Sequence, residues 1–250
     1  MQQVIQQLNQ LKLAGLRDAL IQQTEQPQLY NEQSFMERLT LLLSQELSQR
    51  HSRKIERLSR QAHFRLRAEL ANLDYQASRN IKKAQIRALG EGEWLRLHQN
   101  MLITGATGCG KTYLACALGH HHCQQGKTVY YFRLKELLEK LFLAQADASY
   151  RKLINKLSQA DLLILDDWGL EPLTASQRSD LLELIDARYE LKSTLIASQL
   201  PIKNWYEMIG ESTHADAILD RLIHGSIKIE LQGESMRKKM NSLTEGDHLS

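Results

Sequence analysis

Eight consecutive residues have the types and the spacing that bind a phosphate chain. Residues 105–112 are GATGCGKT and match the pattern G-x-x-x-x-G-K-[ST], between the apolar run 101–104 and the helical stretch TYLACALGHHH. The glycines let the backbone wrap closely around phosphate oxygens, and the following helix adds unpaired N–H groups and partial positive charge. The pattern predicts a phosphate-binding loop made of Gly105, Ala106, Thr107, Gly108, Cys109, Gly110, Lys111 and Thr112.

A second motif supplies the acids that phosphoryl transfer needs. The segment DLLILDDWG at 161–169 is typical of a buried strand that ends in two carboxylates. We expect Lys111 to reach the β- and γ-phosphates, and Thr112 and Asp166 to hold hydrated Mg²⁺. Asp167 is then placed to orient or deprotonate the attacking water. Together the two motifs predict ATP and Mg²⁺ as cofactors.

Three further polar positions are weaker candidates. Ser198 and Gln199 follow the apolar run 194–197, and either side chain could touch the γ-phosphate or the water if that strand lies beside the one ending in Asp166. An ordinary strand-ending turn explains them equally well. Arg221 falls on an expected helix, DAILDRL, and Arg237 precedes a polar tail. Lone arginines are usually solvated.

Positive charge is concentrated in one part of the chain. The whole chain carries a net charge of +3, whereas residues 50–87 hold eleven Lys or Arg against three acids, a net charge of +8. Such a block suggests a polyanionic partner, although a solvated cationic face has the same composition. The residues expected to contact DNA are Arg50, Arg53, Lys54, Arg57, Arg60, Lys82 and Lys83.

The elements that must position these residues differ between the two parts of the chain. Twelve of the thirteen glycines lie from Gly90 onward, and the first part has helical spacing throughout, with a Ser34–Glu37 capping box at one helix start. From about residue 100, five short apolar runs alternate with helices, which favours a parallel sheet. We expect a helical partner- or DNA-binding domain at 1–73, a linker at 74–98 and an α/β ATPase domain at 99–250.

Composition excludes several classes of protein. Hydrophobic residues at 42% and charged residues at 24% are typical of a globular chain, and no apolar run is long enough to cross a bilayer. The Gln-rich start lacks the features of a secretory signal, so we expect a cytoplasmic protein with no membrane partner. Three cysteines are then expected to be reduced thiols, and their helical spacing with His120–His122 does not converge on one metal ion.

With these motifs in place, the chain resembles an AAA+ ATPase of the helicase-loader branch, and more closely the IstB-type helper ATPases of insertion-sequence transposition. The resemblance covers nearly the whole chain, and its segments are LKLAGLRDAL (11–20), HQNMLITGATGCGKTYLACALG (98–119), DLLILDDWGL (161–170), IASQLP (196–201), ADAILDRLIH (215–224) and GESMRKK (233–239). It implies a P-loop AAA+ core with a parallel five-stranded sheet flanked by helices.

The resemblance also implies roles. Ser198 or Gln199 would match the first sensor, Arg221 the arginine finger inserted into a neighbouring subunit, and Arg237 the second sensor. The implied protein is a homo-oligomer with active sites at subunit interfaces, which assembles with ATP on duplex DNA without sequence preference, remodels it and recruits or stimulates a cognate transposase. A replicative helicase loader is the alternative, followed by a small-molecule P-loop kinase and a nucleotide-gated scaffold without meaningful turnover.

Two features depart from the family pattern. Many AAA+ proteins have Glu where this chain has Asp167, so slow hydrolysis stimulated by DNA and oligomerisation is expected. Only 29 residues follow Arg221, which is too few for the usual helical lid.

Overall fold

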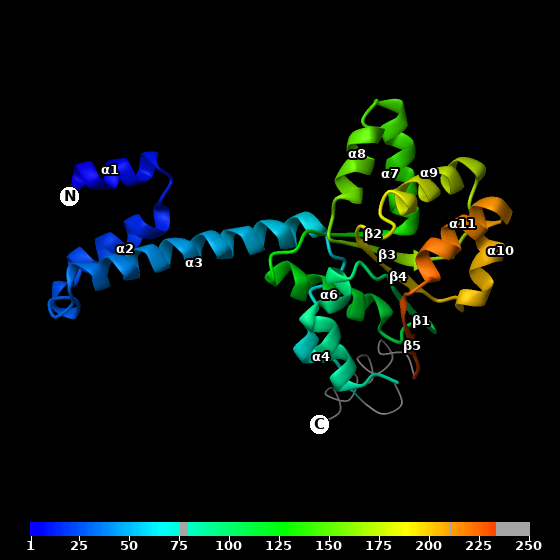
Figure 1. Ribbon diagram of the computed structural model, residues 1–250, viewed down its shortest axis with the longest axis horizontal. Coiled ribbons are helices and arrows are strands. Elements are labelled where there is room, and N and C mark those ends of the chain that lie inside the picture. Colours follow the sequence, from blue (N-terminus) through cyan, green and yellow to red (C-terminus); the bar gives the residue numbers. More distant parts are fainter. Residues whose placement is uncertain (76–79, 211, 234–250) are drawn as a thin grey trace, which may run out of the picture. The chain divides into compact units, whose positions relative to one another are not determined.

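The computed structural model describes residues 1–75, 80–210 and 212–233, which form two compact units (Figure 1). The first unit comprises Met1–Arg57 and the second Leu58–Ser250. Helix α3 begins in the first unit and ends five residues into the second. Elements α1 (Gln2–Gln10), α2 (Ala14–Glu25), the short 3₁₀ helix η1 (Pro27–Leu29) and most of α3 (Phe35–Ala62) make up the first unit.

Close packing of α2 against α3 organises the first unit. A Cβ on Gly15 would lie 2.8 Å from the Glu46 Cα, so the two helix backbones approach closely there. The buried Glu46 carboxylate accepts from the Leu16 amide at 3.0 Å and from Arg50 Nε at 2.6 Å. The expected capping box is confirmed, because Ser34 N donates to Glu37 Oε2 at 2.7 Å and Glu37 N donates to Ser34 Oγ at 3.3 Å.

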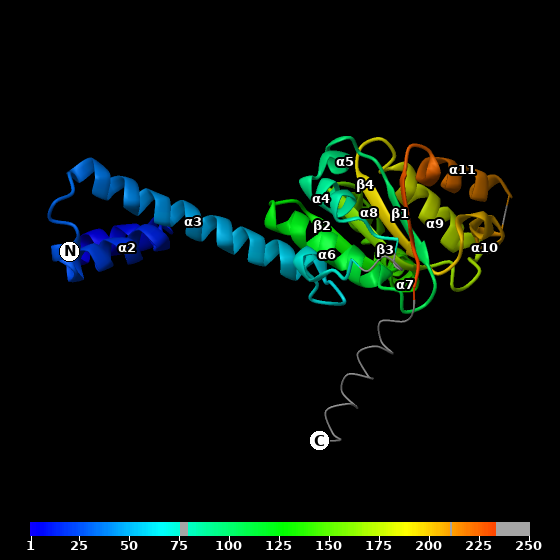
Figure 2. The same ribbon diagram turned by 90° about the horizontal axis from the view of Figure 1, so that it is seen from below.

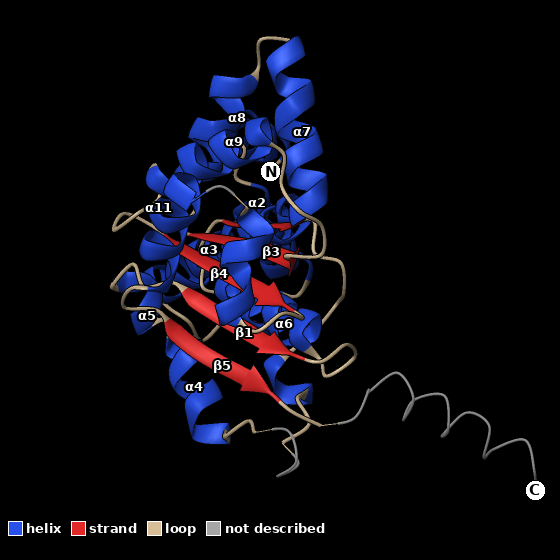
Figure 3. Ribbon diagram, turned by 90° about the vertical axis from the view of Figure 1, so that its right-hand side faces the viewer, coloured by secondary structure: helices blue, strands red, loops and turns tan. Residues whose placement is uncertain are grey.

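A parallel five-stranded sheet forms the centre of the second unit, as the five apolar runs predicted. Its order is β2-β3-β4-β1-β5, so β1 lies between β4 and β5 (Figure 3). Every strand pairs in parallel with its neighbours, and the carboxyl ends therefore meet at one edge. The strands are β1 (Met101–Gly105), β2 (Val129–Arg133), β3 (Leu162–Trp168), β4 (Ser193–Ser198) and β5 (Ile227–Leu231).

Helices cover both faces of this sheet (Figures 1 and 2). Alternate strand residues divide between two hydrophobic cores: Ile103 and Ile164 pack with one, Leu102 and Leu163 with the other. The first core includes η2 (Leu70–Asn72), α4 (Lys83–Glu91), α5 (Glu93–Arg96) and α6 (Lys111–Gln124). The second includes α7 (Leu134–Ala146), α8 (Tyr150–Ser158), α9 (Ala175–Asp186), η4 (Ile202–Asn204), α10 (Trp205–Ile209) and α11 (Ser212–Ile223).

The boundary between the units differs from the one expected at residues 73 and 74. The structure divides the chain between Arg57 and Leu58. Leu58, Ala62 and Leu73 are buried in the same core as β1, so residues 58–73 pack with the sheet. The last turns of α3 have an apolar side, but the sequence did not indicate whether this side would pack in the first unit or in the second. The expected absence of a full lid concerns residues 222–250, of which the structure describes 222–233, with the end of α11 and strand β5.

Candidate nucleotide site and basic surfaces

The phosphate-binding loop joins β1 to α6 at the carboxyl edge of the sheet. Gly108 and Gly110 have φ angles of +83° and +95°, in the left-handed region where a side chain is strained. Lys111 is buried, and its Nζ donates to the carbonyls of Gly105 at 2.8 Å and Ala106 at 2.9 Å. The loop thus holds an ammonium group among its own backbone atoms, at the N-terminus of α6, where anions are favoured.

The two expected metal ligands are brought together. Thr112 Oγ1 donates to Asp166 Oδ2 at 2.7 Å, although 53 residues separate them in the sequence. Tyr131 OH, at the adjacent strand β2, donates to the same oxygen at 2.7 Å. Burial raises the pKa of Tyr131, so this hydroxyl stays a donor at neutral pH. Asp166 itself is only 1% exposed, and a buried carboxylate beside a hydroxyl is the hard oxygen donor set that Mg²⁺ favours.

Asp167 is more exposed than Asp166 and lies between two arginines. Its φ of +56° places it in the left-handed region, which Asp tolerates better than most residues. Its Oδ2 is 3.4 Å from Arg133 Nε and 3.7 Å from Arg65 Nη1. Its amide donates to Asp166 Oδ1 at 2.9 Å. The second carboxylate is therefore held beside the first at the end of β3.

The structure separates the two candidates at the end of β4. Ser198 is fully buried, and its hydroxyl donates to the Trp168 carbonyl at 2.8 Å and accepts from the Leu200 amide at 3.0 Å. Gln199 instead accepts at Oε1 from Thr107 Oγ1, in the phosphate-binding loop, at 2.5 Å. Strand β4 pairs with β3, as the prediction required. Of the two residues, Gln199 has its side chain at the loop.

Arg221 lies near the amino end of β1, whereas the phosphate-binding loop of the same chain follows the carboxyl end of that strand. Asn100, which directly precedes β1, donates from Nδ2 to the Arg221 carbonyl at 2.9 Å. The guanidinium donates to Asp186 Oδ1 at 2.7 Å and to the Ala217 carbonyl at 3.0 Å. Arg221 is therefore not a ligand of the loop in its own subunit. Arg237 lies outside the described residues.

The expected DNA-contacting residues belong to both units. Arg50, Arg53, Lys54 and Arg57 lie in the first unit, and all are exposed. Arg60, Lys82 and Lys83 are exposed in the second. Of the first set, Arg50 is paired with Glu46. The other three keep their side chains at the surface of α3, where a polyanion could reach them.

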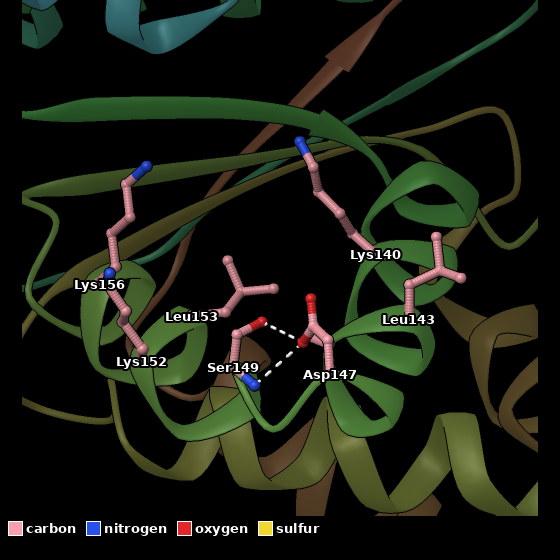
Figure 4. Close-up of a pocket in the computed structure, with 8 residues that line it drawn as sticks. Lys140, Leu143, Asp147, Ser149, Lys152, Leu153 and Lys156 are labelled. Carbon is pink, nitrogen blue, oxygen red and sulfur yellow. Dashed lines mark hydrogen bonds between the residues drawn. The ribbon is translucent and has the colours of Figure 1, made fainter.

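A further basic surface lies between α7 and α8 and was not expected from the sequence. Figure 4 shows Lys140, Lys152 and Lys156 around Leu153 at a groove of about 300 Å³. The ammonium groups of Lys140 and Lys156 lie 5.3 and 4.8 Å from the ring centroids of Phe132 and Tyr130 on β2. One acid, Asp147, also lies at this groove, and its Oδ1 accepts from Ser149 Oγ at 2.6 Å and from the Ser149 amide at 3.0 Å.

Three residues beside Asp166 and Asp167 were also not identified from the sequence, namely Tyr131, Arg133 and Arg65. A signal existed for Arg133, which ends the apolar run 129–132 and pairs in register with Asp166, because carboxyl ends of parallel strands meet at one edge. Arg65 has no comparable signal, since it lies 102 positions before Asp167 in an irregular segment. Among the described residues, no group of three or more His, Cys, Asp or Glu side chains is arranged to hold a metal ion.

Comparison with known proteins gives consistent results. The family model described as IstB-like ATP binding protein matches residues 6–244. An insertion-sequence ATP-binding protein of Sinorhizobium fredii is 44% identical over 237 residues, which cover 94% of this chain and 95% of the relative. The IS1162 ATP-binding protein of Pseudomonas fluorescens is 44% identical over 201 residues, covering 80% of this chain and 87% of the relative.

Solved structures share the fold. The crystal structure of the DnaC helicase loader is similar to this chain, with a TM-score of 0.53 and 22% identity. The similar region covers 60% of this chain and 87% of the DnaC chain. The structure of AMPPCP-bound DnaA from Aquifex aeolicus has a TM-score of 0.59 and 18% identity. The similar region covers 73% of this chain and 56% of the DnaA chain. The second unit therefore has the α/β fold of AAA+ ATPases.

Proposed function

The chain belongs to the family of IstB-like ATP-binding proteins, whose relatives are encoded by insertion sequences, and we propose that it is an ATP-hydrolysing, DNA-binding helper of transposition. In this proposal it oligomerises on duplex target DNA in the cytoplasm, remodels the duplex and recruits or stimulates the cognate transposase. The observation that carries the proposal is the convergence of Lys111, Thr112, Asp166 and Asp167 at one edge of the sheet.

Each of these residues has a distinct role in hydrolysis. Lys111 exchanges its two carbonyl acceptors for phosphate oxygens and neutralises their charge. Asp167 orients the water that attacks the γ-phosphorus and accepts its proton, while the bond to the leaving ADP oxygen breaks. Gln199 lies close enough to the loop to contact the γ-phosphate or that water.

Thr112 and Asp166 would hold Mg²⁺, which supplies charge neutralisation across the β- and γ-phosphates when bound. Tyr131 supports this role, because its hydroxyl fixes the orientation of the Asp166 carboxylate. Asp167 is one methylene shorter than Glu and carries an ion pair on Oδ2, which supports slow turnover.

The basic residues support binding to duplex DNA with little sequence preference. Contacts from Lys and Arg to phosphates give affinity without reading bases. Arg53, Lys54 and Arg57 of α3 and the lysines of the α7–α8 groove are at the surface, where a backbone of phosphates could reach them.

Arg221 supports an active site completed by a neighbouring subunit. It lies at the far end of β1 from its own loop, so it can contact a γ-phosphate only on another copy of the chain. In this arrangement hydrolysis depends on assembly of the subunits. Assembly in turn depends on ATP and DNA.

The test measures particle mass by light scattering and phosphate release in parallel, with ATP and duplex DNA added singly and together. We expect large assemblies only with both ligands, and faster phosphate release in those assemblies. The Asp167→Asn variant should still assemble but release no phosphate. Adding the cognate transposase and donor DNA should give strand-transfer products only when the wild-type protein and ATP are both present.

Lys111→Ala and Lys127→Ala form a matched pair of variants. Each replaces one lysine by alanine, and the two lysines lie near opposite ends of α6. Only the first should abolish assembly. A wild-type protein that stays monomeric with ATP and DNA, or leaves transposase activity unchanged, would contradict the proposal. Preferential capture of a replicative helicase and of single-stranded DNA would support the helicase-loader alternative instead.

A further inference from the structure

The segment that follows α3 lies across α6, the helix that begins with Lys111 and Thr112. We call residues 63–70 the crossing segment. The Phe64 ring lies 4.2 Å from the His120 ring between centroids, and a Cβ on Gly119 would clash with Phe64. The Tyr113 hydroxyl of α6 lies 3.5 Å from the amide nitrogen and the carbonyl oxygen of Glu69. Three contacts along one helix therefore fix where the crossing segment runs.

This course brings one side chain of the basic block to the catalytic edge. Arg65 Nη1 lies 3.7 Å from Asp167 Oδ2, and the arginine side chain is 33% exposed. The contact is an ion pair between partly exposed groups, a kind that contributes little to stability and breaks easily. Arg65 can therefore leave Asp167 at little cost when another anion is available.

From this geometry we propose that Arg65 is a positioning residue that exchanges between two anions. Without DNA it pairs with Asp167 and holds the carboxylate away from the attacking water; on duplex DNA it pairs with a backbone phosphate and releases Asp167. The crossing segment thereby couples DNA contact to hydrolysis. The inference rests on the proposed function and deepens it, because it names the residue through which DNA stimulates the ATPase.

Charge and connectivity favour this exchange. Arg65 lies within the basic block and is followed by the exposed Arg67. Asp167 retains a second partner, Arg133, whose Nε lies 3.4 Å from the same oxygen. Loss of Arg65 alone therefore frees the carboxylate only in part, and the expected increase in rate is modest.

The first test measures affinity for a short duplex in the nucleotide-free full-length protein, over a range of salt concentrations. The proteins are wild type, Arg65→Ala, Asp167→Asn and the double variant. Arg65→Ala should lower the slope of log affinity against log salt by about one phosphate contact. Asp167→Asn should raise affinity, because it removes the competing anion, and this gain should vanish in the Arg65→Ala background. Glu171→Gln, a matched acid that pairs with Lys135, should give no such dependence on Arg65.

The second test measures phosphate release at saturating ATP. Arg65→Ala should raise the DNA-independent kcat by roughly two- to fivefold, as expected for loss of one exposed ion pair, with KM for ATP unchanged. Its DNA stimulation should fall by the same factor. Arg65→Lys should restore wild-type behaviour, and Arg67→Ala should leave the basal rate unchanged. A merely structural role for Arg65 predicts a lower rate in Arg65→Ala instead.

The outcomes separate the two proposals. Wild-type protein that does not bind duplex DNA either with or without ATP would overturn the proposed function. Normal binding, together with additive effects of Arg65→Ala and Asp167→Asn on affinity or a basal kcat that falls in Arg65→Ala, would overturn the exchange by Arg65 and leave the proposed function intact.

Discussion

At the scale of single residues, the carboxyl end of β4 contains two polar side chains with different tasks. Ser198 joins the ends of β3 and β4 through two backbone hydrogen bonds, whereas Gln199 reaches the phosphate-binding loop. A buried hydroxyl with both partners satisfied contributes to folding, because removing it leaves backbone groups unpaired.

We predict that substitutions at these neighbours separate stability from turnover. Ser198→Ala should lower the free energy of unfolding by about 1–3 kcal/mol. Gln199→Ala should keep wild-type stability and ATP affinity but lower kcat by about tenfold or more, since it removes the polar side chain that reaches the phosphate-binding loop. Chemical denaturation and steady-state phosphate release measure the two effects. Equal loss of stability in both variants would contradict the assignment.

His122 provides a prediction about pH. This residue of α6 is fully buried, and burial is the main cause that lowers its pKa below the ordinary 6.5. The unfolded chain therefore binds a proton that the folded chain excludes, so His122 contributes stability above about pH 6.5 that is lost as pH falls through the folded pKa.

We expect the free energy of unfolding to fall as the pH decreases below 6.5, with a slope that is smaller in His122→Leu. For one proton the difference in slope approaches about 1.4 kcal/mol per pH unit. Urea denaturation at a series of pH values gives both slopes. Identical slopes in the two proteins would show that His122 does not account for the dependence.

At the scale of elements, the loop, the double acid and the polar end of β4 meet because the strands run in parallel. The loop follows β1 and the double acid follows β3, and both strands pair with β4, so Thr112 and Asp166, 54 positions apart in the chain, meet at the same carboxyl edge. In the first unit the corresponding organising contact is between helices, where Gly15 allows α2 to approach the backbone of α3.

Gly15→Ala tests this contact. Alanine favours a helix over glycine by about 1 kcal/mol, but its Cβ would lie 2.8 Å from the Glu46 Cα, a backbone atom that cannot move alone. We expect net destabilisation of α2, by about 1–3 kcal/mol for an overpacked contact. Amide hydrogen exchange of residues 14–25 in the full chain measures it. Ser48→Ala, at an exposed position of α3, is the control, and slower exchange in Gly15→Ala would contradict the packing argument.

At the scale of the whole molecule, no helix among residues 1–75, 80–210 and 212–233 has the length and apolar character needed to cross a membrane. The position of Arg221 makes a single subunit an incomplete enzyme under the proposed function. Its pair with Asp186 joins α9 to α11, so a loss of activity on replacement has to be distinguished from a loss of structure.

A mixing experiment makes this distinction. Asp167→Asn should still assemble and retains Arg221 but has no carboxylate to activate the water, and Arg221→Ala retains the loop and both acids but supplies no arginine. Neither variant should hydrolyse ATP alone. Their mixture should recover part of the wild-type rate at interfaces where one subunit supplies Arg221 and the other supplies the intact loop and acids. Asp186→Asn removes the same ion pair and should remain active. An inactive mixture of well-folded variants would contradict an arginine supplied by the neighbour.

The motifs that depend on local spacing could be predicted from the sequence. The loop 105–112, the strand ending in Asp166 and Asp167, and the Ser34–Glu37 capping box each lie within a few residues and require particular backbone conformations. Five apolar runs of strand length also determined a parallel sheet, since their burial on both faces leaves a continuous apolar composition. The family followed from the same segments.

Contacts between side chains that are distant in the sequence could be identified only in the folded protein. Tyr131 reaches Asp166 from β2, Gln199 rather than Ser198 faces the loop, and Arg65 reaches Asp167 from the crossing segment. These contacts depend on side-chain direction at strand ends and on the course of an irregular segment across α6. Neither property has a periodicity that a single sequence displays, because both are fixed by packing between residues far apart in the chain.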